Sequence, residues 1–217
     1  MVLKKLSFGL VLLFCIILLG DCHPPREKPT SIDETKLKLQ RQIDLDYRNP
    51  GLHHQMGKIY QSNGLWYQAE NEFRVALSFD PVHKPSQAAL VRILVDSGQY
   101  GQAKESAKFF MNSAFTSENA SLELGISFQN ENLDDYALSC YQKALSLVPA
   151  SARVNKQLGF FYLKKGDKEK AKQHLIISFN ANPYQPDVAG ELGRLGVAIQ
   201  STPPPKPKPS VQPDTQK

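Results

Sequence analysis

Hydrophobic side chains in the body of the chain recur at the spacing of amphipathic helices, and this pattern is itself repeated at a fixed period. Four segments, residues 54–81, 88–115, 122–149 and 156–183, align with one another without a gap. Large apolar residues hold the same places in these segments, and we expect them to form one continuous core. These residues are Tyr60, Phe73, Phe128, Tyr141, Phe160, Tyr162 and Leu175.

Small residues also hold fixed places in the repeating pattern. Gly57, Gly125 and Gly159 correspond to one another, and an alanine stands at a second place in all four segments. A small side chain is needed where two helix backbones cross closely. The pattern therefore predicts that each segment forms two antiparallel helices that cross at these places. The alanines are Ala69, Ala103, Ala137 and Ala171.

Residues that end helices complete each unit. Glycine adopts the left-handed backbone that ends many helices, and proline does not continue a helix. We therefore expect a glycine to end the first helix and a proline to follow the second. The second unit is the least regular, with Val91 at the place of the first glycine and Phe115 at that of the proline. The glycines are Gly64, Gly98 and Gly166, and the prolines are Pro81, Pro149 and Pro183.

This pattern resembles the tetratricopeptide repeat (TPR), a helix-turn-helix unit of about 34 residues. The resemblance covers residues 50–199 and implies an all-α fold. It implies a right-handed α-solenoid of four units with an N-terminal helix and a C-terminal capping helix, because one unit alone cannot bury its core. The expected parts are a leader over 1–22, a linker and N-terminal helix over 23–49, repeat units over 50–83, 84–117, 118–151 and 152–185, a capping helix over 186–200, and a disordered Pro- and Lys-rich tail over 201–217.

The amino-terminal segment has the order of an export leader. Two lysines precede an apolar run over residues 6–19, which is short for a membrane-spanning helix. The run ends in "LLGDC", which resembles a bacterial lipoprotein box, although Asp21 stands where that box has Gly or Ala. We therefore expect an exported protein of the bacterial cell envelope, anchored to the membrane and facing the periplasm or the outside. Three forms remain open: a lipid on Cys22, ordinary cleavage near Gly20, or an uncleaved anchor.

Charge is nearly balanced in the body of the chain. The whole chain carries a formal charge of +5, but residues 32–200 hold 19 Lys and Arg against 18 Asp and Glu. Nucleic-acid binding is therefore not expected. Residues 118–151 carry one Lys against five acids, whereas residues 152–185 carry seven basic residues against two acids. These counts predict an electric field that changes sign along the array.

The sequence shows no arrangement typical of a catalytic, metal-binding or cofactor-binding site. It contains no phosphate-binding loop, dinucleotide fingerprint, nucleophile elbow or cysteine cluster. His53 and His54 are adjacent, so on a helix they point about 100° apart and do not share a metal ion. Asp134 and Asp135 begin a second helix, where acids favour the helix dipole. We therefore expect no enzymatic activity, no cofactor and no metal ion, and we expect Cys140 to be a buried helix residue.

The resemblance also implies where a partner binds. In the TPR family, positions 2, 5, 9, 12 and 13 of each unit line the concave groove formed by the first helices. In this chain these positions are basic, amide-bearing and partly apolar, which suits an extended peptide or a helix with an acidic group and an apolar anchor. The predicted groove residues are His54, Lys58, Gln61, Arg92, Asp96, Asn119, Ile126, Gln129, Asn130, Arg153, Lys156, Phe160 and Lys164.

We therefore expect a non-catalytic scaffold that binds a protein or peptide partner in the groove and reaches the membrane through its N-terminal anchor. Exported relatives that help assemble type IV pilus secretins have similar leaders and more units, and they supply a more specific alternative. A regulatory subunit of a wall-modifying enzyme is another alternative. The residues leave the partner and the oligomeric state open.

The carboxyl-terminal tail, residues 201–217, holds six of the 15 prolines of the chain. Such a composition disfavours packing and favours an extended polyproline II spacer. The tail also contains the run "KPKP", which suits contact with an anionic surface, although a solvated spacer is the simpler interpretation.

Overall fold

The computed structural model describes residues 31–198, and the leader with Cys22 and the tail over 201–217 lie outside them. This part of the chain is helical and contains no strand. The chain divides into two compact units, Met1–Lys38 and Leu39–Lys217, and the helix pairs belong to the second. The helices are α2 (Ser31–Leu45), α3 (Pro50–Ser62), α4 (Trp66–Phe79), α5 (Lys84–Asp96), α6 (Tyr100–Ala114), α7 (Glu118–Asn130), α8 (Asp134–Leu147), α9 (Ala152–Lys164), α10 (Lys168–Ala181) and α11 (Pro186–Arg194).

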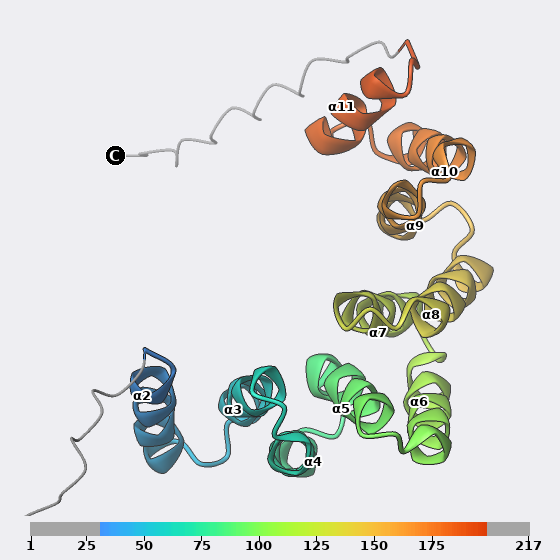
Figure 1. Ribbon diagram of the computed structural model, residues 1–217. Coiled ribbons are helices and arrows are strands. Elements are labelled where there is room, and N and C mark those ends of the chain that lie inside the picture. Colours follow the sequence, from blue (N-terminus) through green and yellow to red (C-terminus); the bar gives the residue numbers. More distant parts are fainter. Residues whose placement is uncertain (1–30, 199–217) are drawn as a thin grey trace, which may run out of the picture. The chain divides into compact units, whose positions relative to one another are not determined.

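The helices follow the repeat period of the sequence. The first helices α3, α5, α7, α9 and α11 begin at residues 50, 84, 118, 152 and 186. The second helices α4, α6, α8 and α10 begin at residues 66, 100, 134 and 168. Each first helix from α3 to α9 packs on the second helix that follows it, and each pair contacts the next pair (Figure 1). The described residues therefore form an α-solenoid of four TPR-type helix pairs, with α11 after the last.

The two helices of a pair meet where a glycine faces a large side chain. A Cβ atom placed on Gly57 would lie 2.5 Å from Cε1 of Phe73. Real Cβ atoms do not approach another carbon so closely, so the missing side chain is what lets the two backbones come together. The corresponding pairs in the third and fourth units are Gly125 with Tyr141, at 2.6 Å from Cε1, and Gly159 with Leu175.

In the second unit the larger residue lies on the first helix and the smaller residue on the second helix, the reverse of the other three units. Val91 stands at the place of the glycine, and Ala107 stands at the place of the large residue. Both side chains are fully buried in the same core cluster. A larger residue on the first helix is therefore compensated by a smaller one on the second, as core packing at constant volume requires.

A residue in the left-handed backbone conformation follows the first helix of each of the four units, and in three of them it is the predicted glycine. Gly64, Gly98 and Gly166 have φ angles of 70°, 78° and 79°. The third unit has no glycine at this place, and Asn132 takes the conformation instead, with a φ angle of 55°. Asparagine adopts this region more readily than most other residues, so all four units keep the same turn between their helices.

The last helix is shorter than expected. α11 ends at Arg194, whereas the sequence led us to expect a helix to residue 200. Gly196 has a φ angle of 74°, and this left-handed residue stops the helix. Val188 and Leu192 are fully buried in a cluster with Leu175 of α10. The short helix therefore still covers the apolar end of the fourth helix pair.

A buried polar residue ties the start of each first helix from α3 to α9 to the segment before it. This residue is the fourth of its unit, and it bonds a backbone carbonyl that precedes the helix. Gln87, for example, is 1% exposed, and its Nε2 donates to the Pro81 carbonyl at 2.7 Å. A carbonyl oxygen removed from water needs such a donor. The four pairs are His53 with Tyr47, Gln87 with Pro81, Ser121 with Ala114, and Asn155 with Pro149.

Replacing Gly57 by alanine tests the helix crossing. We expect Gly57→Ala to lower the free energy of unfolding by about 1–3 kcal/mol, because its Cβ overlaps the buried Phe73 ring. Gly193 is a matched control, because it has the same register in α11 and a Cβ there would meet no atom within 4 Å. Gly193→Ala should leave the stability unchanged or raise it by up to about 1 kcal/mol. Denaturant unfolding measures both, and equal effects of the two substitutions would contradict this account.

Candidate functional site

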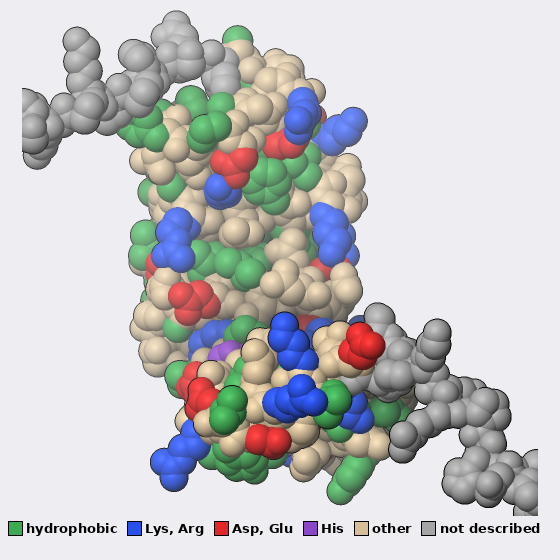
Figure 2. All heavy atoms as spheres, turned by 90° about the vertical axis from the view of Figure 1, so that its left-hand side faces the viewer, with side chains coloured by type: hydrophobic (Ala, Val, Ile, Leu, Met, Phe, Trp, Pro, Cys, Tyr) green, Lys and Arg blue, Asp and Glu red, His purple; other side chains and the backbone are tan. Residues whose placement is uncertain are grey.

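The predicted groove residues all lie on first helices. Those of the first and second units lie on α3 and α5, and those of the third and fourth units on α7 and α9. Figure 2 views the side of the array on which α7, α9 and α11 lie in Figure 1. On this face, lysine and arginine side chains are spread among apolar and acidic ones and do not gather in one patch. Their individual partners therefore decide which charges a ligand can use.

In the first two units, acids neutralise the predicted groove cations. Nζ of Lys58 lies 3.0 Å from both carboxylate oxygens of Glu131, which is far along the chain in the third unit. Nε of Arg92 donates to Asp96 at 3.1 Å, and a second guanidinium nitrogen pairs with the same carboxylate. Glu131 is only 9% exposed, so its charge needs a partner. An acidic ligand would have to break these ion pairs to reach Lys58 or Arg92.

The Lys58–Glu131 ion pair joins the first unit to the third. Lys58 lies on α3, and Glu131 follows the end of α7, so the pair spans the unit between them. The first helix of that unit, α5, packs against α4, α6 and α7, and eight of its 13 residues are buried. The second unit therefore contributes little open surface to the first-helix face.

His54 belongs to a packed junction between the first two units. Its Nδ1 lies 3.3 Å from Oγ of Ser86, which also lies 2.8 Å from Nδ1 of His83. Burial lowers the pKa of His54 to about 4, and the nearby His83 and Lys58 contribute to this lowering. Its imidazole is therefore neutral at pH 7. Ser86 is fully buried, so the cluster joins two helices and does not present a nucleophile to solvent.

Gln61 and Gln129 occupy the same position in the first and third units but have different partners. Oη of Tyr141 donates to Oε1 of Gln129 at 2.5 Å. In the first unit, Phe73 stands at the place of the tyrosine and has no hydroxyl group. Oε1 of Gln61 is buried and, within residues 31–198, has no hydrogen-bond partner. The missing hydroxyl explains this unpaired acceptor.

The third and fourth units present a different surface. Ile126 and Phe160, at the position held by Lys58 and Arg92 in the first two units, are half-buried apolar residues. Exposed Arg153 donates to the Asn119 side chain at 2.8 Å, and exposed Lys164 donates to the Asn132 side chain at 3.2 Å. Neither cation forms an ion pair with an acid of the described chain. This surface therefore combines apolar groups, side-chain amides such as those of Gln129 and Asn130, and two positive charges that no acid offsets.

Lys156 differs from these two cations. Its Nζ lies 2.5 Å from a carboxylate oxygen of Asp187, at the start of α11. The hydrogen bond from Lys156 is the main cause of a lowered pKa at Asp187. Lys165 likewise pairs with Asp134 of the preceding unit. These lysines hold neighbouring units together and are less available to a ligand.

Three further properties of the described residues concern metal binding, membrane crossing and the reactivity of the cysteine. Within them, no group of three or more His, Cys, Asp or Glu side chains could hold a metal ion. No helix between residues 31 and 198 combines the length and apolar character that crossing a membrane requires. Cys140 is fully buried, and this burial raises the pKa of its thiol to about 12. It is therefore an unreactive core residue.

Fold and surface together define an all-α TPR-type array that presents a mixed apolar and basic first-helix face in its third and fourth units. No protein-family model and no curated protein sequence matches the chain.

Several solved structures resemble the chain. MamA of Desulfovibrio magneticus RS-1, from residue 41 to the end, is 20% identical, with 82% of this chain and 94% of that chain covered and a TM-score of 0.38. YrrB, described as a TPR protein with an unusual peptide-binding site, is 20% identical over 75% and 84%, with a TM-score of 0.40. PilF of Pseudomonas aeruginosa is 25% identical over 69% and 68%, with a TM-score of 0.40.

Substitutions at Tyr141 and Phe73 test whether the tyrosine hydroxyl decides which of the two glutamines has a hydrogen-bond donor. Tyr141→Phe should lower the free energy of unfolding by about 1 kcal/mol, because Gln129 loses its donor. Phe73→Tyr should be neutral or raise it by up to about 1 kcal/mol, because the new hydroxyl can donate to the unpaired Gln61 oxygen. Thermal and denaturant unfolding measure both variants. Destabilisation by Phe73→Tyr as large as that by Tyr141→Phe would disprove the assignment.

Proposed function

We propose that the chain is a non-catalytic scaffold that binds a segment of a partner protein on the first-helix face of its third and fourth units. One observation carries this proposal. Ile126 and Phe160 lie at the same position of neighbouring units, and the exposed cations Arg153 and Lys164 lie on the same face without an acidic partner in the described chain.

The chemistry of this surface selects the kind of segment. Half-buried apolar side chains gain most from a partner side chain that completes their burial. Arg153 and Lys164 can exchange their neutral amide partners for a carboxylate, and charge-assisted hydrogen bonds are stronger than neutral ones. The proposed segment is therefore an extended peptide or a helix that carries an apolar anchor and one or more acidic groups.

The paired cations are assigned a different role. Lys58 and Arg92 already have carboxylate partners, and Lys156 holds Asp187 of the capping helix. If a ligand bound one of these cations, an acid of the chain would lose its counter-charge. The free-energy cost of that loss would offset the gain from the new contact. The first and second units therefore support the binding surface and do not form it.

Selection from a random-peptide phage library on the purified repeat array, followed by fluorescence anisotropy with the enriched peptides, tests the proposal. We expect enriched peptides to combine an apolar residue with Asp or Glu. Removing both free cations, in Arg153→Gln with Lys164→Gln, should weaken their binding by about tenfold or more, because two charge-assisted hydrogen bonds are lost.

Lys156→Gln is the matched control for this experiment. It removes one positive charge from the same helix, where the double variant removes two, but that charge is already offset by Asp187, so the peptide affinity should change less than threefold. Undiminished binding to the double variant, or an equal loss with Lys156→Gln, would contradict the proposed site.

We further propose that the scaffold works in a bacterial cell envelope, tethered by a lipid on Cys22. The basic pair, the apolar run over 6–19 and the box-like "LLGDC" support this part of the proposal. In a bacterium that lipidates exported proteins, Cys22→Ala should move the chain from the membrane to the soluble fraction. Cys15→Ala, inside the apolar run, is the control and should leave the chain membrane-bound. Membrane retention of Cys22→Ala would refute the lipid tether.

A further inference from the structure

Two histidines from neighbouring units share one buried hydroxyl group. His54 lies on α3 of the first unit, and His83 precedes α5 of the second unit. Nδ1 of His83 lies 2.8 Å from Oγ of Ser86, and Nδ1 of His54 lies 3.3 Å from the same oxygen. The centroids of the two imidazole rings are 5.6 Å apart. A hydrogen-bonded link therefore crosses the contact between the first two units, which we call the first joint.

The number of hydrogen atoms limits how many protons this link can hold. A serine hydroxyl donates one hydrogen and can accept others. With both rings neutral, Oγ of Ser86 donates to one Nδ1 and accepts a hydrogen from the other. With both rings protonated, each Nδ1 carries a hydrogen, so the hydroxyl hydrogen of the fully buried Ser86 loses its acceptor. Two positive charges would then also lie close together, so the link is incompatible with double protonation.

The residue before the first helix is not titratable in the neighbouring units. Asn49, Ser117 and Ser151 hold this place before α3, α7 and α9, and each side chain accepts a hydrogen bond from a backbone N–H of its own helix. His83 holds the place before α5, and its side chain forms no such bond. Its ring is bonded to Ser86 instead. The first joint therefore carries a titratable group where the next two joints carry a serine.

Burial keeps the two rings of the link neutral at pH 7. It lowers the pKa of His54 to about 4, and the nearby His83 and Lys58 add to this lowering. Burial also lowers the pKa of His83, although the nearby carboxylate of Asp80 acts in the opposite direction. The charged form of each ring is therefore less stable in the closed joint than in water.

The charged groups around the first joint do not offset a proton on either ring. Lys58 of α3 is paired with Glu131 of the third unit. Lys84, the first residue of α5, lies near Asp80 and Glu123. Within residues 31–198, no carboxylate forms a hydrogen bond with either imidazole. A protonated ring therefore gains no salt bridge in exchange for its burial.

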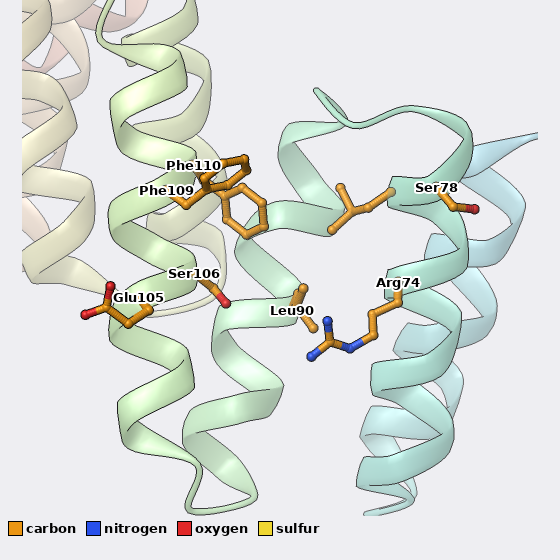
Figure 3. A pocket seen from close by; sticks show the side chains of 8 residues that line it. Arg74, Ser78, Leu90, Glu105, Ser106, Phe109 and Phe110 are labelled. Carbon is orange, nitrogen blue, oxygen red and sulfur yellow. The ribbon is translucent and has the colours of Figure 1, made fainter.

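The same joint contains a cleft between the second helices. The cleft has a volume of about 510 Å³ and lies between α4 of the first unit and α6 of the second. Figure 3 shows Arg74 on α4 and Phe109 on α6 at opposite sides of it, with Leu90 of α5 between them. Phe109 is 68% exposed. The second helices of the two units therefore leave space between them, and the first unit is held mainly through α5, on which α4 packs.

We propose that the first joint is an acid-sensitive hinge, in which protonation of both histidines breaks the link through Ser86 and frees the first unit from the second. In a repeat array each unit contacts mainly its neighbours, so an end unit can open while the other units stay folded. The proposal does not depend on what the first-helix face binds.

The sign of the pH dependence follows from the neutral state of the rings. A ring in the open joint has the ordinary histidine pKa of 6.5, whereas the closed joint lowers the pKa of His54 to about 4. The stabilisation of the closed joint is therefore complete above pH 6.5 and is lost as the pH falls toward 4.

Hydrogen–deuterium exchange of the full chain, measured by mass spectrometry, tests this hinge. Exchange rates in α3 and α4 are compared at each pH with those of the double variant His54→Gln with His83→Gln, so that the intrinsic pH dependence of exchange cancels. Between pH 7 and pH 5, the wild-type rate should rise at least about 20-fold relative to the variant, because the pKa of His54 differs between the open and the closed joint. The same ratio should stay constant in α9 and α10.

His174→Gln is the matched control for the exchange experiment. This half-buried histidine of α10 also has a pKa lowered by burial, but its Nδ1 bonds the side chain of Asn155 within its own unit. Exchange in α3 and α4 of this variant should keep the wild-type pH dependence. A relative rise below about threefold, an equal rise in α9 and α10, or a rise that His174→Gln abolishes would overturn the proposal.

An NMR titration of the unmodified full chain supplies a second readout, which remains valid if the double variant does not fold. The Cε1–H signals of His54 and His83 should both titrate below pH 6.5, with the midpoint of His54 near pH 4. A midpoint at or above 6.5 for either ring would contradict the hinge, because the closed joint would then not favour the neutral form.

Discussion

The two helices of each pair can approach closely only where one of two facing side chains is small. Gly57 against Phe73 and Gly125 against Tyr141 meet this condition in one way, and Val91 with Ala107 meets it in the opposite way. Because the crossing fixes the distance between the helices, it also fixes where the next pair can pack. Because successive first helices, and successive second helices, begin at a constant interval along the chain, the facing positions recur at the same place in all four units.

Stacked helix pairs then bring together residues that lie far apart in sequence. Buried polar side chains such as Gln87 and Asn155 hold each first helix to the segment before it. On the first-helix face, the Lys58–Glu131 pair spans a whole unit and removes two charges from the surface. Among the predicted groove residues, the cations without an acidic partner in the described chain are Arg153 and Lys164 of the fourth unit, on the same face as half-buried Ile126 and Phe160. The proposed binding surface therefore contains the groove cations that have neutral amide partners and excludes those that form ion pairs within the array.

Much of the fold could be predicted from the sequence, because helical periodicity and turn glycines are local signals. The register placed Gly64 and Ala137 correctly, and it placed the groove residues on first helices. The pairing of Lys58 with Glu131 could not be predicted, because it depends on how three units stack and not on any sequence spacing. The end of α11 lies before the expected residue 200, because the left-handed backbone of Gly196 stops the helix, and the hydrophobic periodicity does not reveal this conformation. The hydrogen bonds at the start of the first helices were also not predicted, because the polar residues at the fourth position of every unit recur outside the pattern of hydrophobic positions.

A double-mutant cycle in the irregular second unit tests the central claim most directly. Val91→Gly alone leaves a void and Ala107→Phe alone overfills the crossing, and each should lower the free energy of unfolding by about 1–3 kcal/mol. Together they recreate the glycine and large-residue arrangement of the first unit. The account predicts that the double variant is more stable than the sum of the single effects by at least about 1 kcal/mol. Additive losses in denaturant unfolding would contradict the claim that size complementarity at this crossing builds the array.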